Sequence, residues 1–142
     1  MPLTIKIKRL REDAKIPQYA HPGDAGFDLY AAEDVTLAPN ERAGVSTGIA
    51  MEIPEGHVGL IWDKSGLSIK HGLKTLGGVV DSGYRGEVMV GIINLSDAEY
   101  TIRKGEKVAQ MIIQRKETIA VEEVESLSDT ARGEGGFGST GK

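Results

Sequence analysis

Five short segments of the sequence contain side chains of the kinds that hydrolytic and phosphate-binding sites use. Carboxylates act as general bases or as ligands for a hard cation, and cations with glycine-rich backbone bind phosphate oxygens. Taken singly, each segment has an ordinary structural explanation, because aspartate, serine and glycine are also common turn formers. In chain order the five segments are residues 24–29, 63–67, 77–86, 104–111 and 132–138.

The second and third segments have the most definite chemistry. In 63–67, Lys64 and the backbone N–H groups after an expected strand end are suited to phosphate oxygens. Segment 77–86 is predicted to form a hairpin, with an apolar arm that leads to Asp81 and Tyr84 at its tip. The first segment is interpreted as a turn with two carboxylates.

Several common types of site are not expected. The chain has no cysteine and only three scattered histidines, which excludes a zinc deaminase with a Cys-x-x-Cys motif. Residues 136–142 match the spacing of a Walker loop, but no Ser or Thr follows Lys142 and no βαβ unit surrounds it. We therefore interpret this match as a coincidence.

The elements that must position these segments are predicted to be mostly strands. Apolar and polar residues alternate near residues 3–8 and 100–103, and further short runs are rich in β-branched residues. These runs are 45–53, 58–62, 88–95, 108–114 and 119–124. Only 65–73 favours a helix, with Ser65 as a possible cap and Gly66 and Gly72 against it. The pattern predicts an all-β sandwich, barrel or jelly roll.

The bulk composition limits the partners. A chain of 142 residues fits one domain, and its last part, 126–142, is expected to be a flexible glycine-rich tail. The formal net charge of −4 and 5% aromatic content argue against nucleic-acid binding. No apolar run is long enough for a membrane span, and the first residues lack a signal peptide's apolar region. We expect a cytoplasmic protein.

Together and in this order, the five segments resemble the five motifs of the trimeric dUTPase family. The longest matches are Gly-Val-Val-Asp-x-x-Tyr-Arg-Gly around Asp81 and Arg-Gly-x-Gly-Gly-Phe-Gly-Ser-Thr-Gly from Arg132. The resemblance implies a jelly-roll catalytic domain (1–125) and an arm (126–142) that closes over an active site. It also implies a homotrimer with shared sites and Mg²⁺-dependent hydrolysis of dUTP to dUMP and pyrophosphate, which limits uracil in DNA and supplies dUMP for thymidylate synthesis.

The resemblance also implies individual roles. Asp81 would be the base that activates water, and Asp28 would help to position Mg²⁺ through water. Tyr84 would lie against the deoxyribose, and Phe137 would stack on the uracil. Phosphates would be contacted by Lys64, Ser65, Gly66, Gln110 and Arg132. Further substrate contacts are implied for Thr75, Gly78, Val79, Val80, Met89 and Gly138, with Val79 and Val80 at the uracil edge.

Three positions depart from the common pattern of that family. Asp63 and Lys64 stand where Pro-Arg is usual, Gly83 replaces an acidic residue, and Thr75 replaces an asparagine that helps to read the base. Two alternatives remain open. A dCTP deaminase-like enzyme of the same fold would need an additional glutamate, for which Glu87 and Glu106 are available, and the other alternative is a non-catalytic nucleotide-binding trimer.

Overall fold

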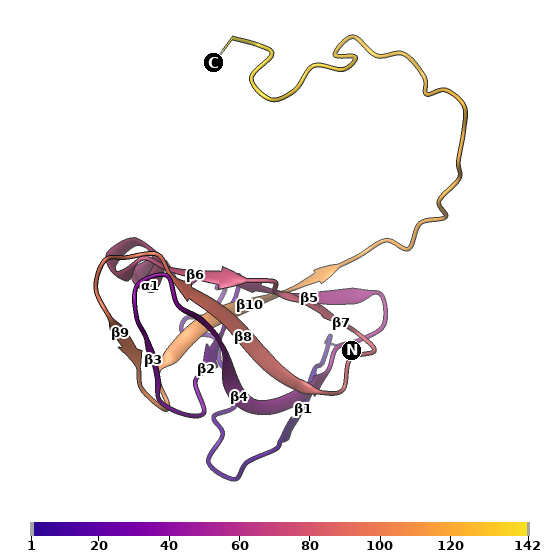
Figure 1. Cartoon of the computed structure of the whole chain (residues 1–142). Coiled ribbons are helices and arrows are strands. Elements are labelled where there is room, and N and C mark those ends of the chain that lie inside the picture. Colours follow the sequence, from indigo (N-terminus) through magenta and orange to yellow (C-terminus); the bar gives the residue numbers. More distant parts are fainter. Residues whose placement is uncertain (1, 142) are drawn as a thin grey trace.

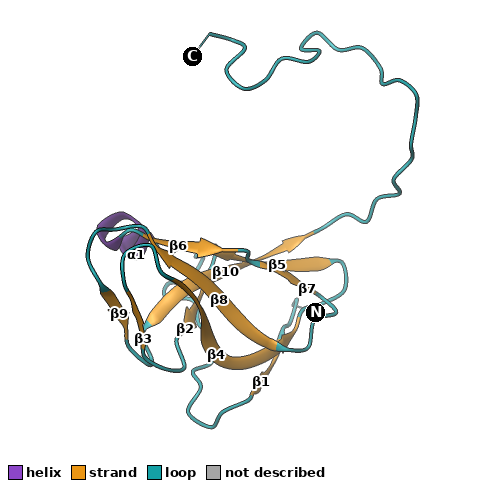
Figure 2. Cartoon of the chain, viewed as in Figure 1, coloured by secondary structure: helices purple, strands orange, loops and turns teal. Residues whose placement is uncertain are grey.

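The computed structural model describes residues 2–141 and is built almost wholly from antiparallel strands (Figures 1 and 2). One four-stranded sheet has the order β1 (Lys6–Arg9), β4 (Arg42–Glu52), β8 (Glu87–Asn94), β6 (Leu73–Leu76). The other has the order β2 (Phe27–Tyr30), β10 (Lys107–Arg115), β5 (His57–Trp62), β7 (Val79–Asp81). A ribbon of β3 (Val35–Leu37) and β9 (Tyr100–Ile102) and one helix, α1 (Ser65–His71), complete the body. The prediction of an all-β, jelly-roll-like fold is confirmed.

The core lies where the inward faces of the two sheets meet. In β8 the residues alternate, so that Val88, Val90 and Ile92 are buried while Met89 is exposed. Leu29 and Met111 contribute fully buried side chains from the second sheet. This period-two burial is the pattern that the sequence showed, and it places every second residue of a strand on the outer surface.

The segment 77–86 is not a hairpin, contrary to the prediction. β7 pairs with β5, with Asp81 opposite Val58, whereas β8 pairs with β4 and β6 in the other sheet. The turn after Asp81 therefore carries the chain from one sheet to the other. We call this turn, residues 82–86, the sheet corner. Asp81 and Tyr84 lie at an edge of the sandwich, not at the tip of a two-stranded arm.

The helix and the first strand differ in detail from the predictions. α1 ends two residues earlier than expected, where Gly72 adopts a left-handed φ of 68°. Ser65 is not its cap, because Lys64 occupies the N-cap position and makes no side-chain capping bond. β1 begins at Lys6, later than the alternation that starts at Leu3 predicted. No helix among residues 2–141 is long and apolar enough to cross a bilayer.

The chain after β10 leaves the body as an extended coil (Figure 1). The predicted strand at 119–124 is wrong, since the described residues beyond Arg115 form no strand. A strand needs a neighbour to accept its backbone hydrogen bonds, and this segment has none within the chain. Its apolar side chains point to solvent, with Ile119 76% and Val121 91% exposed. Lys142, the last residue of the Walker-like match, lies outside the described residues.

Candidate active site

A groove of about 230 Å³ lies at the sheet corner and collects most of the residues expected to read the nucleoside. Its walls come from the end of β5, from β7 and from the start of β8. The lining includes six predicted residues, namely Gly78, Val79, Val80, Asp81, Tyr84 and Met89. Ile61, Glu87 and Val88 complete it and were not predicted. We call this the corner groove.

Asp81 is the last residue of β7 and presents an exposed carboxylate to the corner groove. Its backbone oxygen accepts a hydrogen bond from the Tyr84 N–H at 3.1 Å, which closes the turn. Within residues 2–141, no hydrogen bond or ion pair engages its side-chain oxygens. The carboxylate is therefore available to accept a proton from a water molecule in the groove.

Tyr84 is held by the backbone that follows it. Its hydroxyl donates to the carbonyl oxygen of Glu87 at 2.8 Å. Its ring lies directly on Gly86, where an added Cβ would come within 2.5 Å of the hydroxyl oxygen. These contacts fix the ring as one wall of the corner groove, beside the half-exposed side chain of Met89.

Gly78 sets the path of the chain into β7. It has a φ of 111°, a conformation that only glycine adopts without strain, and a Cβ there would lie 2.9 Å from the Ile61 carbonyl oxygen. Its own carbonyl accepts a hydrogen bond from the Ile61 N–H at 2.8 Å. β7 is the outer strand of its sheet, so alternate backbone groups of Val79–Asp81 point away from β5 and are free to pair with a ligand.

A second cluster contains the residues expected near phosphate and metal. Asp28 is 2% exposed and lies opposite Gln110 in the β2–β10 ladder. Lys64 donates to its Oδ1 at 2.6 Å, and the Lys107 ammonium lies 3.1 Å from Oδ2 outside hydrogen-bonding geometry. Burial raises the pKa of Asp28, but the two lysines outweigh burial and hold the pKa below its usual value. We call Asp28, Lys64, Lys107 and Gln110 the lysine cluster.

Lys107 was not among the predicted residues. It reaches Asp28 because β10 has a register irregularity between Lys107 and Ala109. A bulge of this kind changes the face on which a side chain emerges, and no residue pattern in the segment 104–111 indicates it. Ser65 and Gly66 were predicted, and both lie exposed in the first turn of α1, directly after Lys64.

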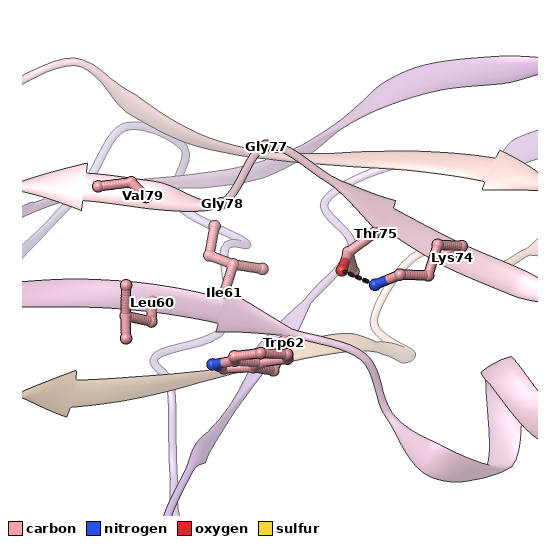
Figure 3. A pocket seen from close by; sticks show the side chains of 8 residues that line it. All are labelled: Leu60, Ile61, Trp62, Lys74, Thr75, Gly77, Gly78 and Val79. Carbon is pink, nitrogen blue, oxygen red and sulfur yellow. Dashed lines mark hydrogen bonds between the residues drawn. The ribbon is translucent and has the colours of Figure 1, made fainter. Parts of the chain in front are cut away.

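Thr75 faces a different cavity from the one that contains Asp81. Figure 3 shows this smaller cavity of about 170 Å³, between the end of β5 and the β6–β7 connection. Its lining residues are Leu60, Ile61, Trp62, Lys74, Thr75, Gly77, Gly78 and Val79. Since Ile61, Gly78 and Val79 also line the corner groove, the two cavities are neighbours.

The corner groove and the lysine cluster do not meet within one chain. Asp81 is opposite Val58 and Gln110 is opposite Trp62, so they lie four residues apart along β5. That spacing is about 13 Å along the strands, and the step from β7 across β5 to β10 adds about 10 Å. The backbones of Asp81 and Gln110 are therefore roughly 16 Å apart.

The predicted tail residues lie away from both groups. Arg132 donates from Nε to the Gly135 carbonyl at 2.7 Å, and the Phe137 side chain is fully exposed. Phe137 and Gly138 have positive φ values of 52° and 81°. In Figure 1 the yellow end of the chain, which contains all three residues, arches away from the body.

The described side chains include one buried carboxylate suited to a limited part in metal binding, but no complete ligand set. Residues 2–141 contain no group of three or more His, Asp or Glu side chains that could hold one. Mg²⁺, however, usually keeps several waters and takes one or two carboxylates together with substrate phosphates. Asp28 fits that more limited role, because one of its buried oxygens has no hydrogen-bond partner among the described residues.

Comparisons with known proteins agree in sequence and in structure. The family model for dUTPase matches residues 12–141. The deoxyuridine 5'-triphosphate nucleotidohydrolase of Thermobifida fusca is 52% identical over 140 residues, covering 96% of this chain and 78% of its own. That of Rhodococcus erythropolis is 53% identical over 142 residues, covering 98% and 87%.

Solved structures of phage dUTPases share the fold. The Staphylococcus bacteriophage 80alpha dUTPase with dUpNHpp has a TM-score of 0.92 and 35% identity, covering 98% of this chain and 99% of its own. A mutant dUTPase from phage phi11 of S. aureus, in which a structural Mg(II) ion is coordinated, has a TM-score of 0.83 and 32% identity, covering 89% and 99%. On the full-length family match and these relatives, the chain belongs to the dUTPase family.

Proposed function

We propose that the protein hydrolyses dUTP to dUMP and pyrophosphate, limiting uracil in DNA and supplying dUMP for thymidylate synthesis. The relatives from Thermobifida and Rhodococcus are named for this reaction, and a similar phage enzyme binds the dUTP analogue dUpNHpp. The observation that carries the proposal is the uncommitted Asp81 carboxylate in the corner groove, beside the fixed ring of Tyr84.

Asp81 acts as the general base in this proposal. It accepts a proton from a water molecule that attacks phosphorus, while the bond between the α- and β-phosphates breaks. The pyrophosphate leaves with the electron pair of that bond. General-base assistance of this kind contributes about 10²- to 10⁴-fold in rate. An aspartate with both oxygens engaged, such as Asp63, is unsuited to the task.

The corner groove accounts for the choice of base and sugar. The hydrogen bond between Ile61 and Gly78 sets the alternation, so that the backbone groups of Val79 point away from β5 and those of Val80, opposite Gly59, point toward it. In this proposal Val79 pairs with the uracil edge from the outside, and cytosine is rejected because its donor and acceptor are exchanged. The Tyr84 ring stands where a ribose 2′-hydroxyl would have to fit. Gly78 and Met89 complete the wall around the nucleoside. Thr75 lines the neighbouring smaller cavity, which shares Gly78 and Val79 with the corner groove.

The lysine cluster and the start of α1 receive the triphosphate. Lys64 and Gln110 supply donors, and the exposed Ser65 and Gly66 offer their backbone N–H groups. Mg²⁺ bound to the phosphates would neutralise charge on the leaving group. Asp28 would orient it through water, and Lys64 would then exchange part of its ion pair with Asp28 for a phosphate oxygen.

The protein works in this proposal as a homotrimer with shared sites. The support is the separation of roughly 16 Å between the backbones of Asp81 and Gln110 within one chain. A site between chains can take Asp81 from one chain and Gln110 from another, so the two residues need not be close within one chain. Residues 1–125 form the catalytic domain. The arm 126–142, with Arg132, Phe137 and Gly138, closes over the site of a neighbouring subunit. The exposed Ile119 and Val121 at its base are suited to a neighbour's apolar surface.

A substrate panel tests the proposed reaction. Purified protein with Mg²⁺ is given dUTP, UTP, dTTP or dCTP, and pyrophosphate release is measured. We expect rapid release from dUTP and little from the other three. Binding of dUTP without pyrophosphate release would instead support the non-catalytic trimer.

The deaminase alternative needs one additional glutamate, and the contacts of both candidates, Glu87 and Glu106, disfavour it. Glu87 lines the corner groove, but its Oε2 accepts hydrogen bonds from the Gly48 N–H at 2.8 Å and from the Ser46 hydroxyl. Glu106 is tied to the Arg103 N–H at 3.1 Å in a surface turn. Glu87 is thus held by two donors and Glu106 lies outside the groove, so neither is as uncommitted as Asp81. Ammonia release from dCTP would overturn this conclusion.

A further inference from the structure

Asp63 stands where the related family usually has proline, directly before the phosphate-binding lysine, and its carboxylate is fully engaged. Oδ1 accepts a hydrogen bond from the backbone N–H of Thr75 at 2.7 Å, and Oδ2 pairs with the ammonium of Lys74 at 2.7 Å. The Asp63 side chain is 22% exposed. Its negative charge therefore points toward β6 and away from the open face where Lys64 emerges.

The backbone of Asp63 makes a third connection. Its carbonyl oxygen accepts a hydrogen bond from Gln110 Nε2 at 2.9 Å. Asp63 thus joins Thr75 on β6, Gln110 on β10 and, through the chain itself, Lys64 at the start of α1. These three residues come from three separate elements and were all predicted to contact substrate. Within residues 2–141, the engaged aspartate is the point at which they meet.

The electrostatics agree with a firmly held carboxylate. Burial raises the pKa of Asp63, but the hydrogen bonds from Lys74 and from the Thr75 N–H outweigh it, and the pKa lies below its usual value. The carboxylate is thus ionised at any pH at which the enzyme would work. Thr75 is buried, so its N–H would be left without a partner if the carboxylate were removed.

We propose that Asp63 is a positioning residue of the substrate site, which fixes the phosphate-binding turn 64–66 against Thr75 and Gln110. The proposal rests on the function proposed above. Asp63 itself touches no phosphate and acts through these neighbours. Its hydrogen bond to Thr75 matters in this role, and its negative charge does not.

Three variants test whether the hydrogen bond of Asp63 to Thr75 or its negative charge is important for substrate binding. Asp63→Ala removes the acceptor for the Thr75 N–H, whereas Asp63→Asn keeps an oxygen that can accept it and loses the charge together with the acceptor for Lys74. Asp34→Ala is a matched control, because Asp34 also accepts a backbone N–H, from Lys104 at 2.8 Å, and also pairs with a cation, Arg103 at 3.4 Å. The Asp34 contacts lie at the β3–β9 ribbon, among residues that line neither cavity.

We expect Asp63→Ala to raise KM for dUTP about tenfold with kcat within about twofold of wild type, since the corner groove is untouched. Asp63→Asn should restore KM to within about threefold, and Asp34→Ala should leave it unchanged. Equal KM values for Asp63→Ala and Asp34→Ala would overturn the proposal. So would a fall in KM for both Asp63 variants, which would mean that the aspartate merely repels phosphate.

Fluorescence provides a readout that does not depend on dUTP hydrolysis. Trp62 is the only tryptophan of the chain, precedes Asp63 and lines the smaller cavity (Figure 3). Without nucleotide, Asp63→Ala should increase acrylamide quenching of Trp62, while Asp63→Asn and Asp34→Ala should match wild type. Unchanged quenching in Asp63→Ala would overturn the positioning role. If wild type fails to hydrolyse dUTP but quenching behaves as expected, the proposed function fails and Asp63 still holds the turn.

Discussion

Three aspartates show how local contacts separate structural carboxylates from reactive ones. Asp28 and Asp63 are largely buried, and lysines hold the pKa of each below its usual value. Asp81 is exposed at the end of an edge strand, and no described side chain pairs with it. The sequence alone does not distinguish these environments, because all three aspartates occupy a strand or a strand end next to a turn.

The first prediction at this scale concerns Asp81. Asp81→Asn keeps the size and the polar contacts of the side chain but cannot accept a proton from water. We expect kcat to fall by about 10²-fold or more, with the dissociation constant of a dUTP analogue changed by less than about threefold. Single-turnover kinetics and calorimetric titration measure the two quantities. A variant with near-normal kcat would show that the base has been wrongly assigned.

The second prediction concerns the ion pair between Lys64 and buried Asp28. Lys64→Met leaves Asp28 with Lys107 alone and should lower the free energy of unfolding by about 1–3 kcal/mol at pH 7. Because the pKa of Asp28 is lowered by folding, this ion pair stabilises the fold above about pH 4 and ceases to do so as pH falls through the folded pKa. The difference between variant and wild type should therefore disappear at lower pH.

Urea unfolding from pH 7 down to pH 3, at one fixed protein concentration, measures this dependence. Lys6→Met is the control, since the Lys6 and Glu52 side chains are 79% and 47% exposed and lie 3.5 Å apart. It should change stability by less than about 0.5 kcal/mol at every pH. A pH-independent loss in Lys64→Met would mean that lost packing, not the ion pair, destabilises it.

Among the elements, the strands were easier to predict than their pairing. Short runs rich in β-branched residues identified the long strands β4, β5, β8 and β10, because strand propensity is a local property of the sequence. The sheet corner was predicted as part of a hairpin. An apolar arm followed by a glycine turn has the same sequence pattern whether the next strand pairs with that arm or enters the other sheet. Which strand accepts the hydrogen bonds of β7 depends on distant residues of β5, and a local pattern cannot show this.

The third prediction concerns the backbone that directs β7. Gly78→Ala places a methyl group 2.9 Å from the Ile61 carbonyl in a glycine-only conformation. We expect a loss of stability of about 2–4 kcal/mol and at least a tenfold fall in kcat/KM, because Val79–Asp81 must shift. Thermal unfolding and steady-state kinetics measure these effects.

Gly77→Ala is the matched control for this element. Gly77 also has a positive φ, of 69°, but an added Cβ there has no neighbour within 4 Å. Gly77→Ala should lower the free energy of unfolding by only about 1–2 kcal/mol, the usual penalty of a left-handed residue, and leave kcat/KM nearly unchanged. Equal effects of the two substitutions would show that backbone strain, and not the contact with Ile61, determines the path of β7.

At the scale of the whole molecule, the tail shows which contacts a single chain makes by itself and which contacts would need other chains. The β-branched run at 119–124 predicted a strand, yet among residues 2–141 it has no partner strand and remains coil. The five motifs were predicted to form one site, yet the corner groove, the lysine cluster and the tail lie apart. The proposed homotrimer would account for both discrepancies in the same way, because the missing contacts would then belong to other copies of the chain.

The fourth prediction tests this explanation with two inactive proteins. A chain that ends at Ala131 lacks Arg132, Phe137 and Gly138 but keeps the whole body, since the hydrogen bonds of the described residues 132–141 all lie within the tail. We expect it to fold and to assemble like wild type, as judged by circular dichroism and light scattering, and to release almost no pyrophosphate. An unfolded product would show that the arm is structural. Asp81→Asn chains provide the second inactive protein.

Mixing the two proteins in equal amounts, with denaturation and refolding to exchange subunits, distinguishes shared sites from single-chain sites. No chain in the mixture has both an intact Asp81 and an intact arm. If each site takes Asp81 from one chain and the arm from another, each component is intact half of the time, and about a quarter of wild-type activity should return. If each site is built from a single chain, the mixture stays inactive. Activity that remains absent although the refolded mixture has the mass of the native oligomer would therefore contradict the shared site.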